Sequence, residues 1–172
     1  MKIEKMKKTI IVTKTLLFLL LTLGISTSCN QTSSAEKWLK SIFECPNGSN
    51  FCFPDQEKVF TKQYLEFYYE SLEIYEYPDF ETEEEQVAAE KAFENKWKNI
   101  YSLDAYIWPP FGMGNGIEVG YNLKNVTITP IAELEYTVII DFGQETVFSN
   151  KVVLVRSGEA FLIDYIETDL IK

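Results

Sequence analysis

The chain has 172 residues, of which 46% are hydrophobic and 15% aromatic, a composition that favours a folded domain over a disordered chain. Residues 1–28 carry five lysines against one glutamate, whereas the remainder carries 11 basic and 25 acidic side chains, a net charge of −14. Such an acidic surface repels phosphate backbones, so nucleic acid is excluded as an expected partner.

Histidine is absent from the chain. This removes the commonest general base, the commonest metal ligand and the Ser-His and Cys-His pairs of nucleophilic catalysis. Chemistry based on carboxylate, lysine or tyrosine stays open. We therefore lean towards a protein that is not an enzyme, and we predict neither a cofactor nor a metal site.

The first 28 residues have the three parts of an export signal. A lysine-rich start is followed by the apolar run Thr15–Ile25 and by small residues that lead to Cys29. The apolar run has eleven residues, which is too short to span a bilayer, and Lys14 precedes it. We predict cleavage before Cys29, a polar tether over 29–34 and a single domain over 35–172.

The residues Ile25-Ser26-Thr27-Ser28-Cys29 resemble the lipobox of bacterial lipoproteins, with Ser26 in place of the usual leucine. This departure is similar to the looser signals of Bacteroidetes-type bacteria. The resemblance implies that Cys29 carries acyl chains such as palmitate, which anchor the protein to a membrane. An acidic run after the cysteine resembles a surface-export signal of such bacteria, and no such run follows Cys29. We therefore expect an outer-membrane protein that faces the periplasm, with the cell surface as the alternative. A secretory signal with a chance cysteine is the rival interpretation.

Two cysteines, Cys45 and Cys52, remain after Cys29 is assigned to lipid. An even pair in an oxidising compartment favours a disulfide. The intervening Pro46-Asn47-Gly48 is typical of a turn, which brings the two ends of the loop together. Two thiolates without histidine make a poor zinc site, so we predict a structural disulfide.

Helices are predicted over 35–44 and 55–77 from the spacing of apolar residues. Asp55 can cap the second region, and Thr61 can restart it after a break. Pro78 ends it.

A third helix is predicted to begin at Thr82, because Thr82–Glu85 has the capping-box pattern and three glutamates lie in the first turn, where the helix dipole favours negative charge. Its expected apolar face includes Val87, Phe93, Trp97 and Ile100. A calcium site is the alternative interpretation of the acidic run, and capping is the simpler one.

Beyond residue 116, apolar side chains recur at every second position, which is typical of strands. We predict strands over 117–123, 125–129, 134–142, 151–156 and 161–166. Turns are expected at Ser149-Asn150 and Ser157-Gly158, and Pro130 is expected to end the second strand. Helices followed by an antiparallel meander predict an α+β domain with N-terminal helices packed on one face of the sheet.

Three segments resemble known proteins: Phe60–Leu65, Phe111–Ile117 and Val152–Ile166. Over roughly residues 35–168 the chain resembles the cystatin-like cone of nuclear-transport-factor-like and ketosteroid-isomerase-like proteins. More narrowly, it resembles a family of Bacteroides-type lipoproteins. The resemblance implies a curved antiparallel sheet wrapped by helices, with room for an internal cavity. It implies no catalytic residues.

Two aspartates stand among apolar residues of predicted strands, Asp141 and Asp164. A buried, unpaired carboxylate has a raised pKa, and in an isomerase-like cone it can act as a base or a neutral donor. The structural interpretation, which we favour, is that each aspartate lies at a strand end or pairs with Arg156 or Lys151.

Aromatic residues gather between the third helix and the sheet, among them Tyr106 and Trp108. With Asp141 and Asp164 they make a tentative pocket for an apolar or sugar-like ligand, although such residues more often form core.

Our leading hypothesis is a lipid-anchored, non-catalytic domain that binds another envelope protein or a small ligand. One alternative is a cone-fold isomerase or hydrolase that uses the buried carboxylates. The other is an inhibitor or immunity-type protein whose acidic face covers a basic partner.

Overall fold

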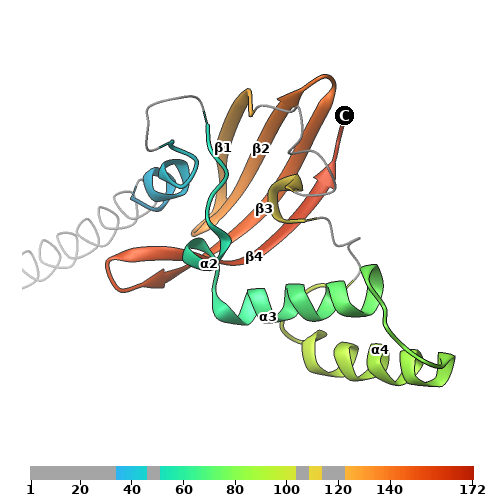
Figure 1. Cartoon of the computed structure of the whole chain (residues 1–172). Coiled ribbons are helices and arrows are strands. Elements are labelled where there is room, and N and C mark those ends of the chain that lie inside the picture. Colours follow the sequence, from blue (N-terminus) through green and yellow to red (C-terminus); the bar gives the residue numbers. More distant parts are fainter. Residues whose placement is uncertain (1–33, 46–50, 104–108, 114–122) are drawn as a thin grey trace, which may run out of the picture.

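The computed structural model describes residues 34–45, 51–103, 109–113 and 123–172. In these residues, helices precede one antiparallel sheet, which confirms the predicted α+β class with helices on a curved sheet (Figure 1). The predicted signal, Cys29 and all of the tether except Ser34 lie outside the described residues.

The helical part begins with a helix over 34–41. The elements that follow are α2 (Gln56–Val59), α3 (Lys62–Ser71), the π-helix η1 (Leu72–Glu76), α4 (Glu83–Trp97) and the 3-10 turn η2 (Pro110–Gly112). Within the described part of the chain, no helix has the length and apolar character needed to cross a bilayer.

The sheet is a meander of neighbouring strands in the order β1-β2-β3-β4. Its strands are β1 (Asn125–Ala132), β2 (Glu135–Gly143), β3 (Thr146–Ser157) and β4 (Ala160–Leu170). In Figure 1, α3 and α4 lie side by side below the sheet, while the segment that leads into α2 crosses in front of it.

Two predicted helix starts are confirmed by the threonine side chains that cap them. The Thr61 hydroxyl accepts a hydrogen bond from the backbone N–H of Tyr64 at 3.1 Å, which starts α3. The Thr82 hydroxyl accepts one from the N–H of Glu85 at 3.2 Å, which starts α4. Each bond satisfies a backbone donor that has no partner within its helix.

Two capping details differ from the prediction. Asp55 makes no capping hydrogen bond at α2, because its carboxylate pairs with Lys58 at 2.8 Å. In α4 the Glu85 carboxylate accepts a hydrogen bond from the N–H of Glu81 at 3.1 Å, rather than from that of Thr82 as a capping box requires.

The predicted turn at Ser149-Asn150 is wrong, because β3 continues through both residues. The chain reverses instead at Gln144 and Glu145, whose φ angles of 53° and 67° are both left-handed. Asn150 is fully buried; its amide donates to the Val138 carbonyl at 2.9 Å and its side-chain oxygen accepts from the Thr168 hydroxyl at 2.7 Å. A residue typical of turns therefore serves here as a satisfied buried polar group.

The other strand predictions have mixed outcomes. The strand over 134–142 is confirmed as β2, and the hairpin at Ser157-Gly158 joins β3 to β4. Pro130 does not end β1, which extends to Ala132. The strand predicted over 117–123 lies almost wholly outside the described residues.

The core lies between the sheet and the segments that cover it. Alternate residues of β2 point into it, and all four of them are essentially unexposed: Tyr136, Val138, Ile140 and Phe142. The Phe111 ring packs against Phe43 and Phe60, with centroids 5.1 and 6.0 Å away. Gly112 follows with a φ of 74°, and a Cβ atom there would lie 2.4 Å from the Phe148 ring, so the core requires glycine at this position.

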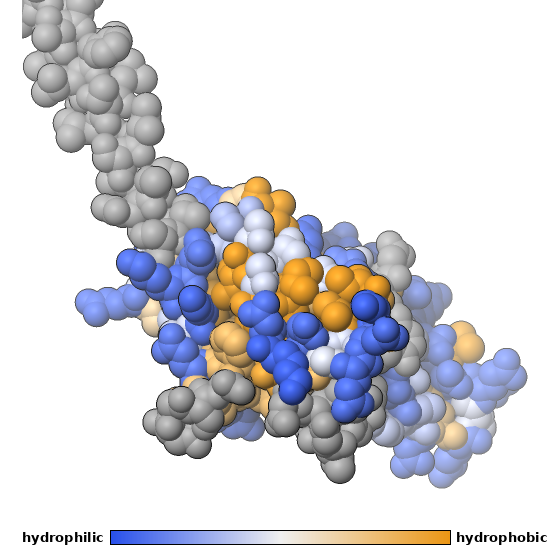
Figure 2. All heavy atoms as spheres, turned by 90° about the horizontal axis from the view of Figure 1, so that it is seen from above, coloured by the Kyte–Doolittle hydropathy of each residue, from blue (hydrophilic) through white to orange (hydrophobic). Residues whose placement is uncertain are grey.

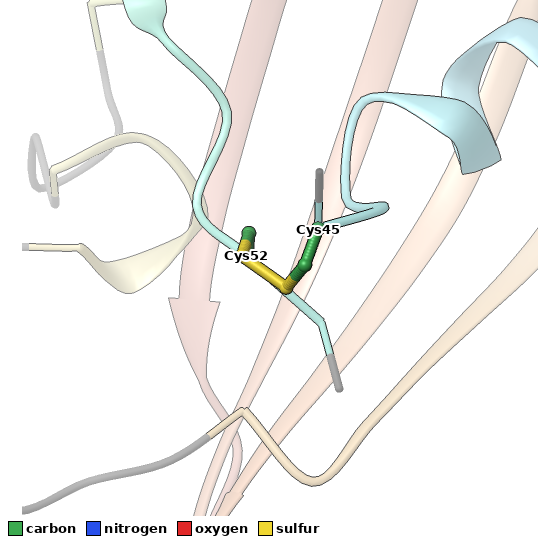
Figure 3. The surroundings of a disulfide bond; sticks show 2 residues. All are labelled: Cys45 and Cys52. Carbon is green, nitrogen blue, oxygen red and sulfur yellow. A yellow bond between two sulfur atoms is a disulfide. The ribbon is translucent and has the colours of Figure 1, made fainter. Parts of the chain in front are cut away.

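The predicted disulfide between Cys45 and Cys52 is present, with the two Cα atoms 5.0 Å apart (Figure 3). The backbone N–H of Cys52 also donates to the Phe43 carbonyl at 2.8 Å. Since Phe43 is fully buried, these links hold the end of the first helix against the core.

Candidate functional site

The two aspartates that the sequence singled out lie far apart in the sheet. Asp141 in β2 pairs with Val147, whereas Asp164 lies in a bulge of β4 beside the Val153–Tyr165 pair. These positions are separated by about six residues along β3, or about 20 Å. The structure therefore does not bring the two carboxylates together.

Asp141 holds a turn. Its side chain accepts a hydrogen bond from the backbone N–H of Gly143 at 2.7 Å. Its backbone carbonyl accepts one from the N–H of Lys124 at 2.7 Å. Both contacts support the start of the β2–β3 connection, where Gly143 has a φ of 76°.

Asp164 binds Thr61, which the sequence analysis did not foresee. The Thr61 hydroxyl donates to the Asp164 carboxylate at 2.9 Å, and the N–H of Thr61 donates to the Ile163 carbonyl at 2.8 Å. Among the ion pairs of the described residues, neither Arg156 nor Lys151 contacts Asp164, so the expected pairing with them is wrong. The carboxylate joins the cap of α3 to the bulge of β4.

A cluster of tyrosines packs beside this link. The Tyr101 ring stacks on Tyr165 with centroids 5.5 Å apart and meets Tyr64 edge-on at 5.9 Å. Burial raises the pKa of Tyr101 to about 12, and the nearby Asp164 carboxylate adds to the rise, although Thr61 opposes it. The Tyr101 hydroxyl is buried, and among the described residues no group meets it with hydrogen-bond geometry. The cluster is therefore neutral at physiological pH and packs as core. The other members of the predicted pocket, Tyr106 and Trp108, lie outside the described residues.

A groove of about 550 Å³ opens instead between the end of α3, the π-helix η1 and α4. We call α3, η1 and α4 together the helical hairpin, or simply the hairpin, and this groove the hairpin groove. The apolar part of its lining, which we call the floor, comes from Ile74, Phe80, Ala89, Ala92 and Phe93. Its rim is polar and comes from Glu70, Glu73, Tyr77, Asp79 and Lys96. Both its volume and its apolar floor are typical of ligand sites.

Local sequence explains why the two helices leave space between them. Ala89, Ala92 and Phe93 share one face of α4, and two of these three side chains are methyl groups. On the opposite side, α3 widens into the π-helix η1, a distortion that is frequent at functional sites. The Phe93 ring is only 4% exposed and stacks on Phe67 at 5.5 Å, so the floor is firmly supported.

The rim carries a paired part and an unpaired part. The Lys96 ammonium contacts both Glu66, at 2.7 Å, and Glu70, while the Trp97 indole N–H donates to Glu70 at 2.7 Å. Desolvation alone raises the pKa of Glu70, but the hydrogen bonds from Lys96 and Trp97 outweigh it and hold that pKa below its ordinary value. Lys96 is thus neutralised by two carboxylates.

Glu73 and Asp79 form the unpaired part of the rim. Both are exposed, and among the described residues neither has an ion-pair partner. With Glu70, the lining of the groove therefore carries three carboxylates against one lysine.

The groove was not predicted from the sequence, because the apolar residues of the third predicted helix were expected to lie together on one face of it. Val87 and Ile100, which were expected on that face, are 56% and 49% exposed, and Ile100 lies beyond the end of α4. In α4 only Phe93 and Trp97 are buried. The available signal was the thin apolar face of this helix, which contains alanines where a packed helix carries larger side chains.

The acidic first turn of α4 does not gather metal ligands. In the described ranges, no three carboxylates or thiolates lie close enough together to hold a metal ion. The hairpin itself presents mainly hydrophilic side chains, as the distant right-hand side of Figure 2 shows.

No protein-family model matches the chain, and no curated protein or solved structure is significantly similar to it.

Proposed function

We propose that the chain is a lipid-anchored protein of the bacterial cell envelope whose domain binds a partner without catalysing a reaction. The observation that carries the binding role is the hairpin groove, with its apolar floor and charged rim. The partner is another envelope protein or a small ligand, and the groove takes up its apolar group. The anchor is Cys29, at the end of the export signal.

The positions of the carboxylates support a binding role over an isomerase or hydrolase. A reaction shared by Asp141 and Asp164 requires them to face one substrate. They lie about 20 Å apart along the sheet. Each also accepts a hydrogen bond that holds local structure, from Gly143 and Thr61 respectively.

The disulfide supports an envelope location, because disulfides persist in oxidising compartments such as the periplasm. The anchor is tested by expressing the full chain and its Cys29→Ser variant in a bacterium that processes lipoproteins, with an alkyne-labelled palmitate. We expect label and membrane association for the wild type only. An unlabelled wild-type chain, or a mature chain that begins elsewhere, contradicts the anchor. Protease treatment of intact cells then separates the periplasmic from the surface orientation.

The binding role is tested with Nile red, a neutral dye whose fluorescence rises in apolar sites. We expect Ala92→Trp to abolish the fluorescence gain, because the indole ring fills the groove. The matched control is Ala88→Trp, since Ala88 is exposed on α4 and does not line the groove. Equal dye binding by both variants contradicts the groove as a binding site.

A further inference from the structure

We infer that the hairpin groove recognises a cationic amphipathic peptide segment, in which lysine or arginine residues flank one or two apolar side chains. This inference rests on the binding role proposed above and specifies the chemistry of the partner. Three observations carry it: the size and character of the floor, the charge of the rim and the construction of α4.

The floor selects for apolar side chains. It is lined by the large apolar side chains of Ile74, Phe80 and Phe93 and by the methyl groups of Ala89 and Ala92. A volume of about 550 Å³ accommodates a few side chains rather than a whole helix. Burial of one leucine or phenylalanine side chain removes apolar surface from water and so favours the complex.

The rim selects for positive charge. Lys96 already contacts Glu66 and Glu70, so it offers no free charge to an anionic ligand. Glu73 and Asp79 remain available, and both lie beside the apolar floor. A cation placed there is attracted by both carboxylates and by the net negative charge of the domain.

The helix α4 strengthens this preference. Its first turn consists of Glu83, Glu84 and Glu85, and Glu90 lies two turns into the helix. Over residues 62–97 the chain carries eleven carboxylates against three lysines, so a cationic partner meets the stronger attraction. An acidic or neutral amphipathic peptide meets the same floor without the attraction of the rim, which makes charge the discriminating property.

The inference is tested with three fluorescent peptides of equal length. The first combines lysine with leucine and phenylalanine, the second replaces each lysine by glutamate, and the third replaces the apolar residues by serine. Binding to the purified mature domain is measured by anisotropy over a range of salt concentrations. We expect only the first peptide to bind, and we expect its affinity to fall as salt rises.

Variants locate the contact. Ala92→Trp is expected to weaken binding about tenfold or more, because it occupies the position of the apolar side chain. Ala88→Trp carries the same helix-propensity change and is expected to leave the affinity within about twofold. Glu73→Gln and Asp79→Asn are each expected to weaken binding about threefold and to reduce its salt dependence.

Three outcomes are decisive. The cationic preference is overturned if the lysine and glutamate peptides bind equally well. It is also overturned if neither peptide binds while Nile red still binds and Ala92→Trp blocks the dye. In both cases the binding role stays intact. If the wild-type domain binds neither the dye nor any of the peptides, the proposed binding role itself is overturned. Binding of the lysine peptide that is insensitive to Ala92→Trp places the interaction elsewhere on the acidic surface and also overturns the inference. Thermal unfolding of each variant verifies that it is folded.

Discussion

Thr61 and Asp164 are 103 positions apart in the chain, and the hydroxyl of the first donates to the carboxylate of the second at 2.9 Å. The same hydroxyl accepts the hydrogen bond that starts α3. One threonine side chain therefore joins the helical hairpin to the sheet. The hairpin groove, which lies at the far end of α3, takes its position relative to the sheet in part from this contact.

Thr61→Ala is expected to lower the free energy of unfolding by about 2 kcal/mol, because it removes a helix cap and leaves Asp164 without its donor. Thr82→Ala is the matched control, since it removes an exposed cap whose hydroxyl has no second partner in the described part of the chain, and it is expected to lower the free energy by about 0.5–1 kcal/mol. Urea unfolding of both variants measures the difference. Equal effects would show that the link to Asp164 contributes nothing.

Gly112→Ala is expected to destabilise the domain by about 3 kcal/mol or more, because the added methyl group enters the Phe148 ring and the residue keeps a left-handed conformation. Gly158→Ala separates these two effects. Gly158 has a φ of 64° with no atom within 4 Å of the added Cβ, so only the conformational cost of about 1 kcal/mol applies. Thermal melts of the two variants give the comparison, and similar losses would refute the steric argument.

Tyr101→Phe is expected to leave stability unchanged or to raise it by up to about 1 kcal/mol, because no group of the described residues meets the buried hydroxyl with hydrogen-bond geometry. Tyr64→Phe is expected to lower stability by up to about 1 kcal/mol, since the Tyr64 hydroxyl donates to the Ile166 carbonyl at 3.4 Å. Denaturant unfolding distinguishes the two. A clear loss in Tyr101→Phe would reveal that this hydroxyl does make a bond in solution.

Glu70→Gln is expected to flatten the dependence of stability on pH in the acid range. The pKa of Glu70 is held below its ordinary value of 4.5, so its contribution is fully present above pH 4.5 and is lost as the pH falls through the lowered pKa. The contribution is small, below about 1 kcal/mol, because the pair with Lys96 is partly exposed. Unfolding curves between pH 3 and 7 test this, with the exposed loop variant Glu133→Gln as control.

Removal of the disulfide by the double substitution Cys45→Ser and Cys52→Ser is expected to lower the free energy of unfolding by about 2–3 kcal/mol, in accordance with the short loop that it closes. Because the bond lies outside the hairpin, dye binding in the hairpin groove is expected to be unchanged. Chemical reduction of the wild type provides an independent measurement. Loss of dye binding without loss of folding would contradict the separation of the two regions.

The elements with a clear local signal were predictable from the sequence. Thr82 and the three glutamates after it define the start of α4, and strict alternation defines β2. The β2–β3 turn was not predictable, because Gln144 and Glu145 adopt left-handed angles that asparagine and glycine normally supply. Asn150 was wrongly predicted to lie in a turn, because asparagine is typical of turns, whereas a tertiary hydrogen-bond network holds this one inside β3.

The candidate site depends on features that a single sequence does not reveal. The bulge that displaces Asp164 is a register shift between β3 and β4, and its partner Thr61 belongs to a distant helix. The hairpin groove arises because Ala89 and Ala92 face η1 across a gap, which depends on how the two helices meet. Apolar periodicity predicts that residues such as Val87 are buried, but it does not predict whether another element covers them.

The bulge in β4 affects whether another strand can pair with this edge of the sheet. β4 is the last strand of the described sheet, and an unprotected last strand is a template on which a second molecule can add its own. Here Phe60 forms a bridge to Ile163, and Asp164 then distorts the ladder at the next residue. The bridge and the bulge interrupt the row of free backbone groups along this strand, which disfavours the addition of a strand from a second molecule at this edge of the sheet.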